Sequence, residues 1–141
     1  MALAAIFSEF LLVQSSAFWQ YYYKNQVRLV AQLLAADLRS LQQETLFEVG
    51  TPRDIKTSSQ NKSVYGIYLT RTVKKRVAFD DYGCGDVYFK YGVDTLRFSY
   101  NGAPSQTVNS SYSLGHAKLA NFSCRVEVQP VTGRVLVYEE E

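Results

Sequence analysis

The first 49 residues contain neither proline nor glycine, so no residue in positions 1–49 forces a break in a helix. From Gln26 onward, apolar residues recur at three- and four-residue steps, the spacing of one helix face: Val27, Val30, Leu34, Leu38 and Leu41. Polar residues occupy the other faces: Arg28, Gln32, Asp37, Arg39 and Gln43. We therefore expect one helix from near Met1 to about Gln43, roughly 60 Å long at ~1.5 Å per residue.

The start of this helix is apolar. The run Met1–Val13 is interrupted only by Ser8 and Glu9, but as a helix it covers ~20 Å, against ~30 Å for a bilayer core. It lacks the basic start and the small-residue cleavage site of a signal peptide. A cluster of rings closed by a cation follows: Phe18, Trp19, Tyr21, Tyr22, Tyr23 and Lys24. We expect these residues to be a membrane-interface belt after a span shortened at its N-terminal end. The alternative is a soluble helix with a buried apolar face.

The pattern changes after the turn signal at residues 49–52, beyond which short strands alternate with Gly, Asn and Asp breaks. We expect strands at Glu44–Val49, Ser63–Arg71, Lys74–Phe79, Asp86–Tyr91, Thr95–Tyr100, Ser110–Gly115, Asn121–Gln129 and Arg134–Tyr138. Val126 and Val128 should share one face, and Thr132-Gly133 should join the last two strands as a hairpin. The predicted fold class is α+β, with a long N-terminal helix packed on a C-terminal antiparallel β domain. Residues 1–25 would be the membrane or filament-core half of the helix, and residues 26–141 the rest.

Charge argues against nucleic acid as the main partner. The chain has 15 basic and 13 acidic residues, for a formal net charge of +2, whereas phosphate binding needs a concentrated basic face. The cluster Arg71, Lys74, Lys75 and Arg76 could contact DNA phosphates, but it equally suits a solvated hairpin whose lysines protect a strand edge, and we favour the second interpretation.

Catalytic and metal-binding patterns are missing from the sequence. The single histidine, His116, is expected to be an ordinary loop residue, and no base or nucleophile motif surrounds it. Cys84 and Cys124 are not part of a CxxC or Cys/His cluster, so they would form one disulfide if the domain is exported, or remain two buried thiols. We predict no enzymatic activity, no cofactor and no small-molecule substrate.

Several stretches together resemble type IV pilin-like proteins. Met1–Ile6 (MALAAI) is similar to the second part of the pilin N-terminal signature, and Gln32–Gln43 (QLLAADLRSLQQ) to the end of the pilin helix. Leu96–Gly102, Ser113–Gly115 and Val126–Val135, the last with its Thr-Gly-Arg turn, resemble the C-terminal strands. The chain is most similar to the group of H-type minor pseudopilins of type II secretion, FimT-like minor pilins and competence minor pilins.

The sequence departs from that family at its start. The prepilin leader, its cleavage site and the signature glutamate are absent, and Glu9 follows the ALAAI run instead of preceding it. In the family that glutamate pairs with the free N-terminus of a neighbouring subunit during assembly. We expect that Met1 is internal to a longer helix, or that the chain was trimmed.

The resemblance implies a structural subunit of a type IV pilus, type II secretion or competence filament, anchored in the cytoplasmic membrane by a single pass with its C-terminal domain extracytoplasmic. Its partners would be other pilins, through the N-terminal helix, and the membrane. One alternative is weak DNA or ligand binding, as in some FimT-like proteins, at Arg71, Lys74, Lys75, Arg76 and Arg134. Another is an unrelated membrane-anchored extracytoplasmic domain.

Overall fold

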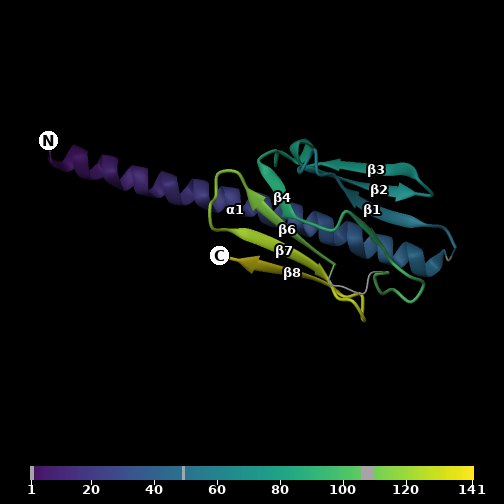
Figure 1. Ribbon diagram of the computed structural model, residues 1–141. Helices are drawn as coiled ribbons and strands as arrows, with labels where there is room; N and C mark the ends of the chain where they lie inside the picture. The colour runs from purple at the N-terminus through teal and green to yellow at the C-terminus, as the bar shows by residue number, and fades with distance from the viewer. Residues whose placement is uncertain (1, 49, 106–109) are drawn as a thin grey trace.

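One helix dominates the molecule. The computed structural model describes residues 2–48, 50–105 and 110–141, and side chains from Ser16 onward. Helix α1 (Ala2–Phe47) is 46 residues long. Its N-terminal half projects beyond the β strands, and its C-terminal half lies along them (Figure 1). Within the described residues, no helical stretch combines the length and the apolar character needed to cross a membrane.

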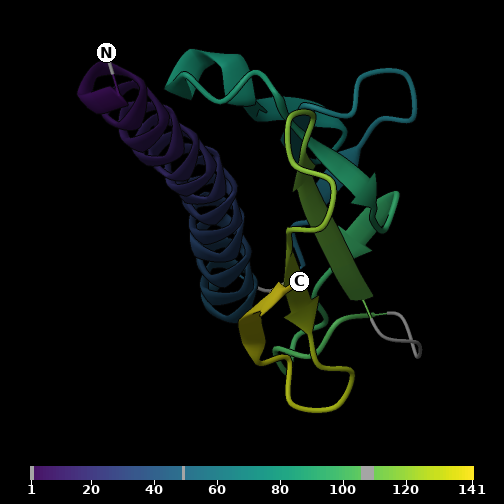
Figure 2. The same cartoon turned by 90° about the vertical axis from the view of Figure 1, so that its left-hand side faces the viewer.

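Two antiparallel sheets follow the helix. The first has the strand order β3-β2-β1-β5, formed by β3 (Thr72–Ala78), β2 (Val64–Leu69), β1 (Arg53–Thr57) and β5 (Thr95–Arg97). The second has the order β4-β6-β7-β8, formed by β4 (Val87–Tyr91), β6 (Ser110–His116), β7 (Ser123–Val128) and β8 (Val135–Glu140). The short 3-10 helix η1 (Phe79–Tyr82) connects β3 to β4. Viewed nearly along α1, both sheets lie to one side of the helix (Figure 2). The predicted α+β class is therefore confirmed.

The core forms between the C-terminal half of α1 and the two sheets. All five residues of the predicted apolar stripe are buried, as are Ala31 and Ala35 beside them. The sheets supply the opposite side, including Ile55, Tyr65 and Leu114. Val126 and Val128 are both fully buried, which confirms their predicted common face.

The helix continues further than predicted. It ends at Phe47 instead of Gln43, and the predicted strand at Glu44–Val49 is wrong, although Val49 itself lies outside the described residues. Apolar and polar residues in this segment alternate too briefly to distinguish a strand from a last helical turn. In the structure the Thr45 hydroxyl donates to the carbonyl of Leu41 at 2.8 Å, one turn earlier, as a helical threonine does.

Strand β1 was missed because its sequence, RDIKT, is mostly charged. Its charges have partners in the fold: Arg97 binds the Asp54 carboxylate through two nitrogens, at 2.6 and 3.0 Å, and Arg53 forms an ion pair with Glu48. Between these residues, Ile55 is fully buried. Pairing across the fold thus allows a charged segment to be the third strand of a four-stranded sheet.

Asp37 corrects a second expectation. The sequence pattern predicts Asp37 on a polar face of the helix, but the residue is buried against the first sheet. Its carboxylate accepts a hydrogen bond from the Tyr65 hydroxyl at 2.5 Å and an ion pair from Lys75 at 2.9 Å. Burial, together with this hydrogen bond, raises the pKa of the Tyr65 phenol, so Tyr65 stays a donor. Asp37 therefore joins α1 to strands β2 and β3.

The turns at the end where α1 stops are tightly packed. The predicted hairpin between the last two strands is confirmed, and Gly133 has a φ of 69° there. The Gln42 amide donates to the carbonyls of Gly102, at 2.5 Å, and Gly133, at 3.0 Å. The turn between β2 and β3 instead places Thr70 and Arg71 at φ of 50° and 70°, a region that residues other than glycine rarely adopt.

Candidate functional site

Aromatic side chains surround α1 where it leaves the β domain. Phe18 and Tyr21 are 60% and 63% exposed, and Trp19 and Tyr22 are nearly half exposed. The rings contact one another: Phe18 stacks on Tyr22 with centroids 6.4 Å apart, and Trp19 stacks on Tyr23 at 5.8 Å. Exposed rings gathered in this way are unusual on a soluble monomer and mark an interaction surface. We call Phe18, Trp19, Tyr21 and Tyr22 the aromatic belt.

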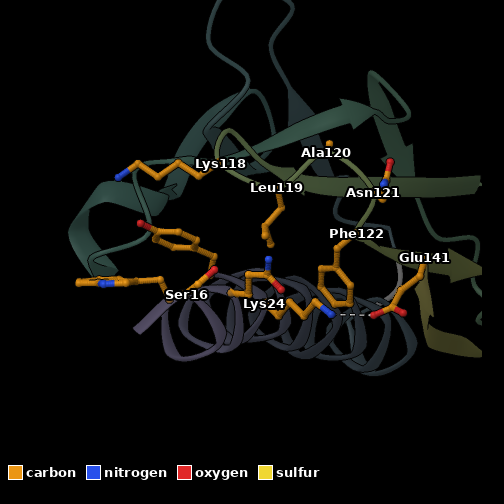
Figure 3. A pocket seen from close by; sticks show the side chains of 11 residues that line it. Ser16, Lys24, Lys118, Leu119, Ala120, Asn121, Phe122 and Glu141 are labelled. Carbon is orange, nitrogen blue, oxygen red and sulfur yellow. Dashed lines mark hydrogen bonds and ion pairs between the residues drawn. The ribbon is translucent and has the colours of Figure 1, made fainter. Parts of the chain in front are cut away.

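A groove of about 600 Å³ lies beside the belt (Figure 3). One wall is the helix, with Trp19 and Tyr23, and the other is the segment between β6 and β7. From that segment Leu119 and Phe122 point toward the helix (Figure 3). The groove is therefore lined by apolar side chains together with polar and charged ones, among them Gln20, Asn121 and Lys24.

The charged groups of the groove are paired. Lys24 forms an ion pair with Glu141 at 2.9 Å, and Arg28 binds Glu139 at 2.5 Å. The hydrogen bond from Arg28 lowers the pKa of Glu139 and raises that of Arg28 itself. Lys24 and Arg28 also lie over the Phe122 ring, at 5.3 and 5.4 Å from its centroid. The acidic end of β8 thus neutralises the cations of the helix, while Lys118, the other cation of the groove lining, lies 3.6 Å from the Asp86 carboxylate.

His116 closes the inner side of this region. It was expected in a loop, but it is the last residue of β6 and is almost fully buried, because its ring packs 4.6 Å from the Tyr23 ring. Its Nδ1 accepts the backbone N–H of Lys118 at 3.1 Å, so the proton lies on Nε2, which donates to the Gln26 side chain at 2.6 Å. Burial lowers the pKa of His116. This neutral histidine holds the β6–β7 segment against the helix.

The predicted DNA-contact residues do not form one basic site. Lys74 and Lys75 are exposed on the edge strand β3, but each is paired with the helix, Lys74 with Glu44 and Lys75 with Asp37. Arg71 and Arg76 lie at the two ends of that cluster, and Arg134 belongs to the turn before β8 in the other sheet. Two of the five cations are therefore already paired with carboxylates of the helix, and Arg134 belongs to the second sheet, whereas the other four belong to the first.

Cys84 and Cys124 are both buried and carry free thiols. Burial raises the pKa of both thiols, that of Cys124 to about 11. The predicted disulfide stays a prediction. Among the described residues, no group of three or more His, Cys, Asp or Glu side chains is placed to hold a metal ion.

The role of the ring-rich segment at the membrane interface stays a prediction, and the groove could not be predicted from the sequence. The ring-rich segment is visible as a local run, whereas Leu119 and Phe122 come from a loop about one hundred residues later. The partners of Lys24 and Arg28 lie 117 and 111 residues away. The only available signal was the opposite charge of the helix and the C-terminal glutamates, and it does not specify pairing.

Two solved structures are similar to this chain in fold. Both are the type IV minor pilin FimU of Pseudomonas aeruginosa, in two crystal forms. The first aligns with a TM-score of 0.66 and 12% identity over 84% of this chain and 92% of that chain. The second has a TM-score of 0.59 and 13% identity over 79% and 92%. No protein-family model matches the sequence, and no curated protein matches it. The chain therefore has a pilin-like α+β fold, with one long N-terminal helix packed on antiparallel β-sheets.

Proposed function

We propose that this chain is a structural subunit of a type IV pilin-like filament, with no catalytic role. The observation that carries the proposal is the aromatic belt, a set of exposed rings on a helix that extends beyond its own domain. Exposed rings of this kind are buried by association, because removing them from water is favourable. The likeness to FimU supports the same interpretation at the level of fold.

The position of the belt suggests separate roles for the two parts of the chain. Residues 1–25 would pack with the helices of other pilins or lie in the cytoplasmic membrane before assembly, and residues 26–141 would form the extracytoplasmic surface. The groove beside the belt would receive side chains of a neighbouring helix, since Leu119 and Phe122 offer apolar contacts within it and Lys24 is already paired with Glu141. A type IV pilus, a type II secretion system and a competence filament are all compatible hosts.

The test uses the filament itself. In a strain deleted for the gene, we expect filament assembly, or the transport that it drives, to be lost and the full chain to restore it. A Trp19→Ser/Tyr22→Ser variant should be stable but absent from sheared filaments, because it lacks two rings of the belt. The matched control is Tyr91→Ser, which removes a ring that is 52% exposed on β4, away from the belt, and should assemble normally. Normal filaments in the clean deletion would refute the proposal.

Binding of DNA is less well supported, because Lys74 and Lys75 are paired with carboxylates of α1. A gel shift with the full chain in detergent, repeated across salt concentrations, separates the two functions. We expect no retardation of DNA at physiological salt. Strong, salt-sensitive retardation would support the DNA-binding alternative.

A further inference from the structure

A second exposed apolar surface lies at the opposite end of the molecule, where α1 stops. It consists of Leu46, Phe47, Tyr100 and Val131, which we call the end face. Phe47 and Val131 are 87% exposed and Tyr100 is 75% exposed, so these side chains have almost no cover from their own chain. The filament role proposed above uses the aromatic belt and leaves this surface without a partner.

The end face is assembled on a rigid base. The loops that carry Tyr100 and Val131 meet so closely that a Cβ on Gly133 would lie 2.0 Å from the carbonyl oxygen of Gly102. A Cβ on Gly102 would in turn lie 3.7 Å from the side chain of Leu46. Because the Gln42 amide binds both loops, the position of the end face relative to α1 is fixed before any partner arrives.

Two unpaired arginines flank the end face. Arg134 follows Gly133, and Arg71 lies in the β2–β3 turn, which is held beside Pro52 by the 3.0 Å bond from the Thr70 N–H to the Pro52 carbonyl. Pro52 and Tyr100 line the same hollow. Neither arginine has an ion-pair partner in the described part of the chain, whereas Arg97 nearby is paired with Asp54. The end face is thus apolar at its centre and positive at its sides.

The other end of the β domain has the complementary charge. Asp80 and Asp81 are exposed in η1, next to the half-exposed ring of Tyr82. The Gln26 amide donates to the carbonyl of Gly83 at 3.0 Å, which places η1 beside the N-terminal part of the packed helix, far from Phe47. Neither aspartate has an ion-pair partner among the described residues, although Lys62 lies at this end too and offsets part of their charge.

From these observations the geometry points to a head-to-tail contact between copies of this chain. The end face of one copy docks on η1 of the next, with Arg71 and Arg134 facing Asp80 and Asp81, and the apolar side chains covering Tyr82. A contact between two different surfaces propagates as an open chain unless its rotation closes a ring. The inference rests on the proposed function, because a filament provides the axial neighbour.

Cross-linking tests the contact directly. Full-length Arg134→Cys chain and full-length Asp81→Cys chain are mixed in detergent micelles, which cover the aromatic belt, and then oxidised. We expect a mixed disulfide dimer, and none between Arg134→Cys and Lys90→Cys, since Lys90 is exposed on β4 away from both ends. Wild-type chain measures the background from its buried thiols. Absence of the mixed dimer, or equal yield with Lys90→Cys, overturns the inference.

Charge reversal provides a second test. Arg71→Glu/Arg134→Glu and Asp80→Lys/Asp81→Lys should each weaken self-association about tenfold or more in sedimentation, because like charges then face each other. An equimolar mixture of the two variants should regain the association of the wild type, since the reversed charges match. The control Lys56→Glu/Lys90→Glu changes the net charge as much as the arginine variant does and should associate normally. Failure of the mixture to recover association refutes the contact.

The outcomes also separate this inference from the proposed function. If Arg71→Glu/Arg134→Glu still enters sheared filaments while Trp19→Ser/Tyr22→Ser does not, the result supports assembly through the helix and refutes the end-face contact. If neither variant affects filaments and the deletion has no phenotype, the proposed function fails first.

Discussion

Asp37 offers the sharpest test of how α1 is fastened to the first sheet. Replacing it with alanine removes the acceptor for Tyr65, whose side chain is 1% exposed, and the partner of Lys75. The Tyr65 hydroxyl then has no acceptor in its place. We expect the full chain to fold with the same architecture but with a lower free energy of unfolding.

The magnitude follows from the burial of the partners. A hydrogen bond to a charged group contributes ~1.5–3 kcal/mol to stability. The penalty for leaving the Tyr65 hydroxyl without an acceptor is the loss of this same hydrogen bond, so the two values are not added. The Lys75 side chain is 46% exposed, so its ion pair adds ~0.5 kcal/mol at most. Alanine has a higher helix propensity than aspartate by ~0.5 kcal/mol, and this difference offsets the loss of the ion pair with Lys75. The expected loss is about 2 kcal/mol.

Urea unfolding followed by circular dichroism measures this loss. With a slope of ~2 kcal/mol per molar, the midpoint for Asp37→Ala should fall by ~1 M. Asp37→Asn, which keeps an acceptor oxygen, should lose about half as much. In a double-mutant cycle, Tyr65→Phe should cost little in the Asp37→Ala background, because the bond is already gone. Additive losses for the two substitutions, or a midpoint for Asp37→Ala equal to that of the wild type, would refute the reasoning.

Three further outcomes are expected from the same kind of measurement. Burial lowers the pKa of His116 in the folded chain, so the stability that the neutral ring contributes is complete above the unfolded pKa of ~6.5. This stability is lost as the pH falls toward the folded pKa. The urea midpoint of His116→Gln should therefore depend less on pH between 5 and 7 than the midpoint of the wild type does. Gly133→Ala should lower the free energy of unfolding by ~2–3 kcal/mol, because the added Cβ would collide with Gly102. The control Gly83→Ala has a similar φ of 72° but open space around the added Cβ, so it should lower the free energy of unfolding by only ~1 kcal/mol. Equal losses would contradict the packing argument. Thr70→Asn should raise the free energy of unfolding by ~0.5–1 kcal/mol, because asparagine tolerates a positive φ better than a β-branched residue does. A lower urea midpoint for this variant would show that Thr70 makes a compensating contact.

The helix and most strands could be predicted because their signals are local. The buried stripe from Val27 to Leu41 repeats within one or two turns, and the hairpin at Thr132-Gly133 depends on neighbouring residues. Strand β1 and the inward position of Asp37 could not be predicted in this way. In both, a charged side chain is accepted in the interior because a partner from a distant part of the chain satisfies it, Arg97 for Asp54 and Tyr65 for Asp37.

The same distinction explains how much of the candidate site was visible. The rings of the belt are close together in sequence, so their clustering could be predicted without knowledge of the fold. Their exposure to solvent could not be predicted in this way. Val27 is fully buried while Tyr22, little more than one turn earlier, is 45% exposed, so the helix passes from a packed to an unpacked environment within a few residues. In the same part of the helix, Lys24 and Arg28 bind the C-terminal glutamates. These pairs are largely exposed and individually weak, so the direction of the projecting half is maintained by the continuous backbone of α1. In the filament role proposed above, a neighbouring subunit would cover these exposed rings.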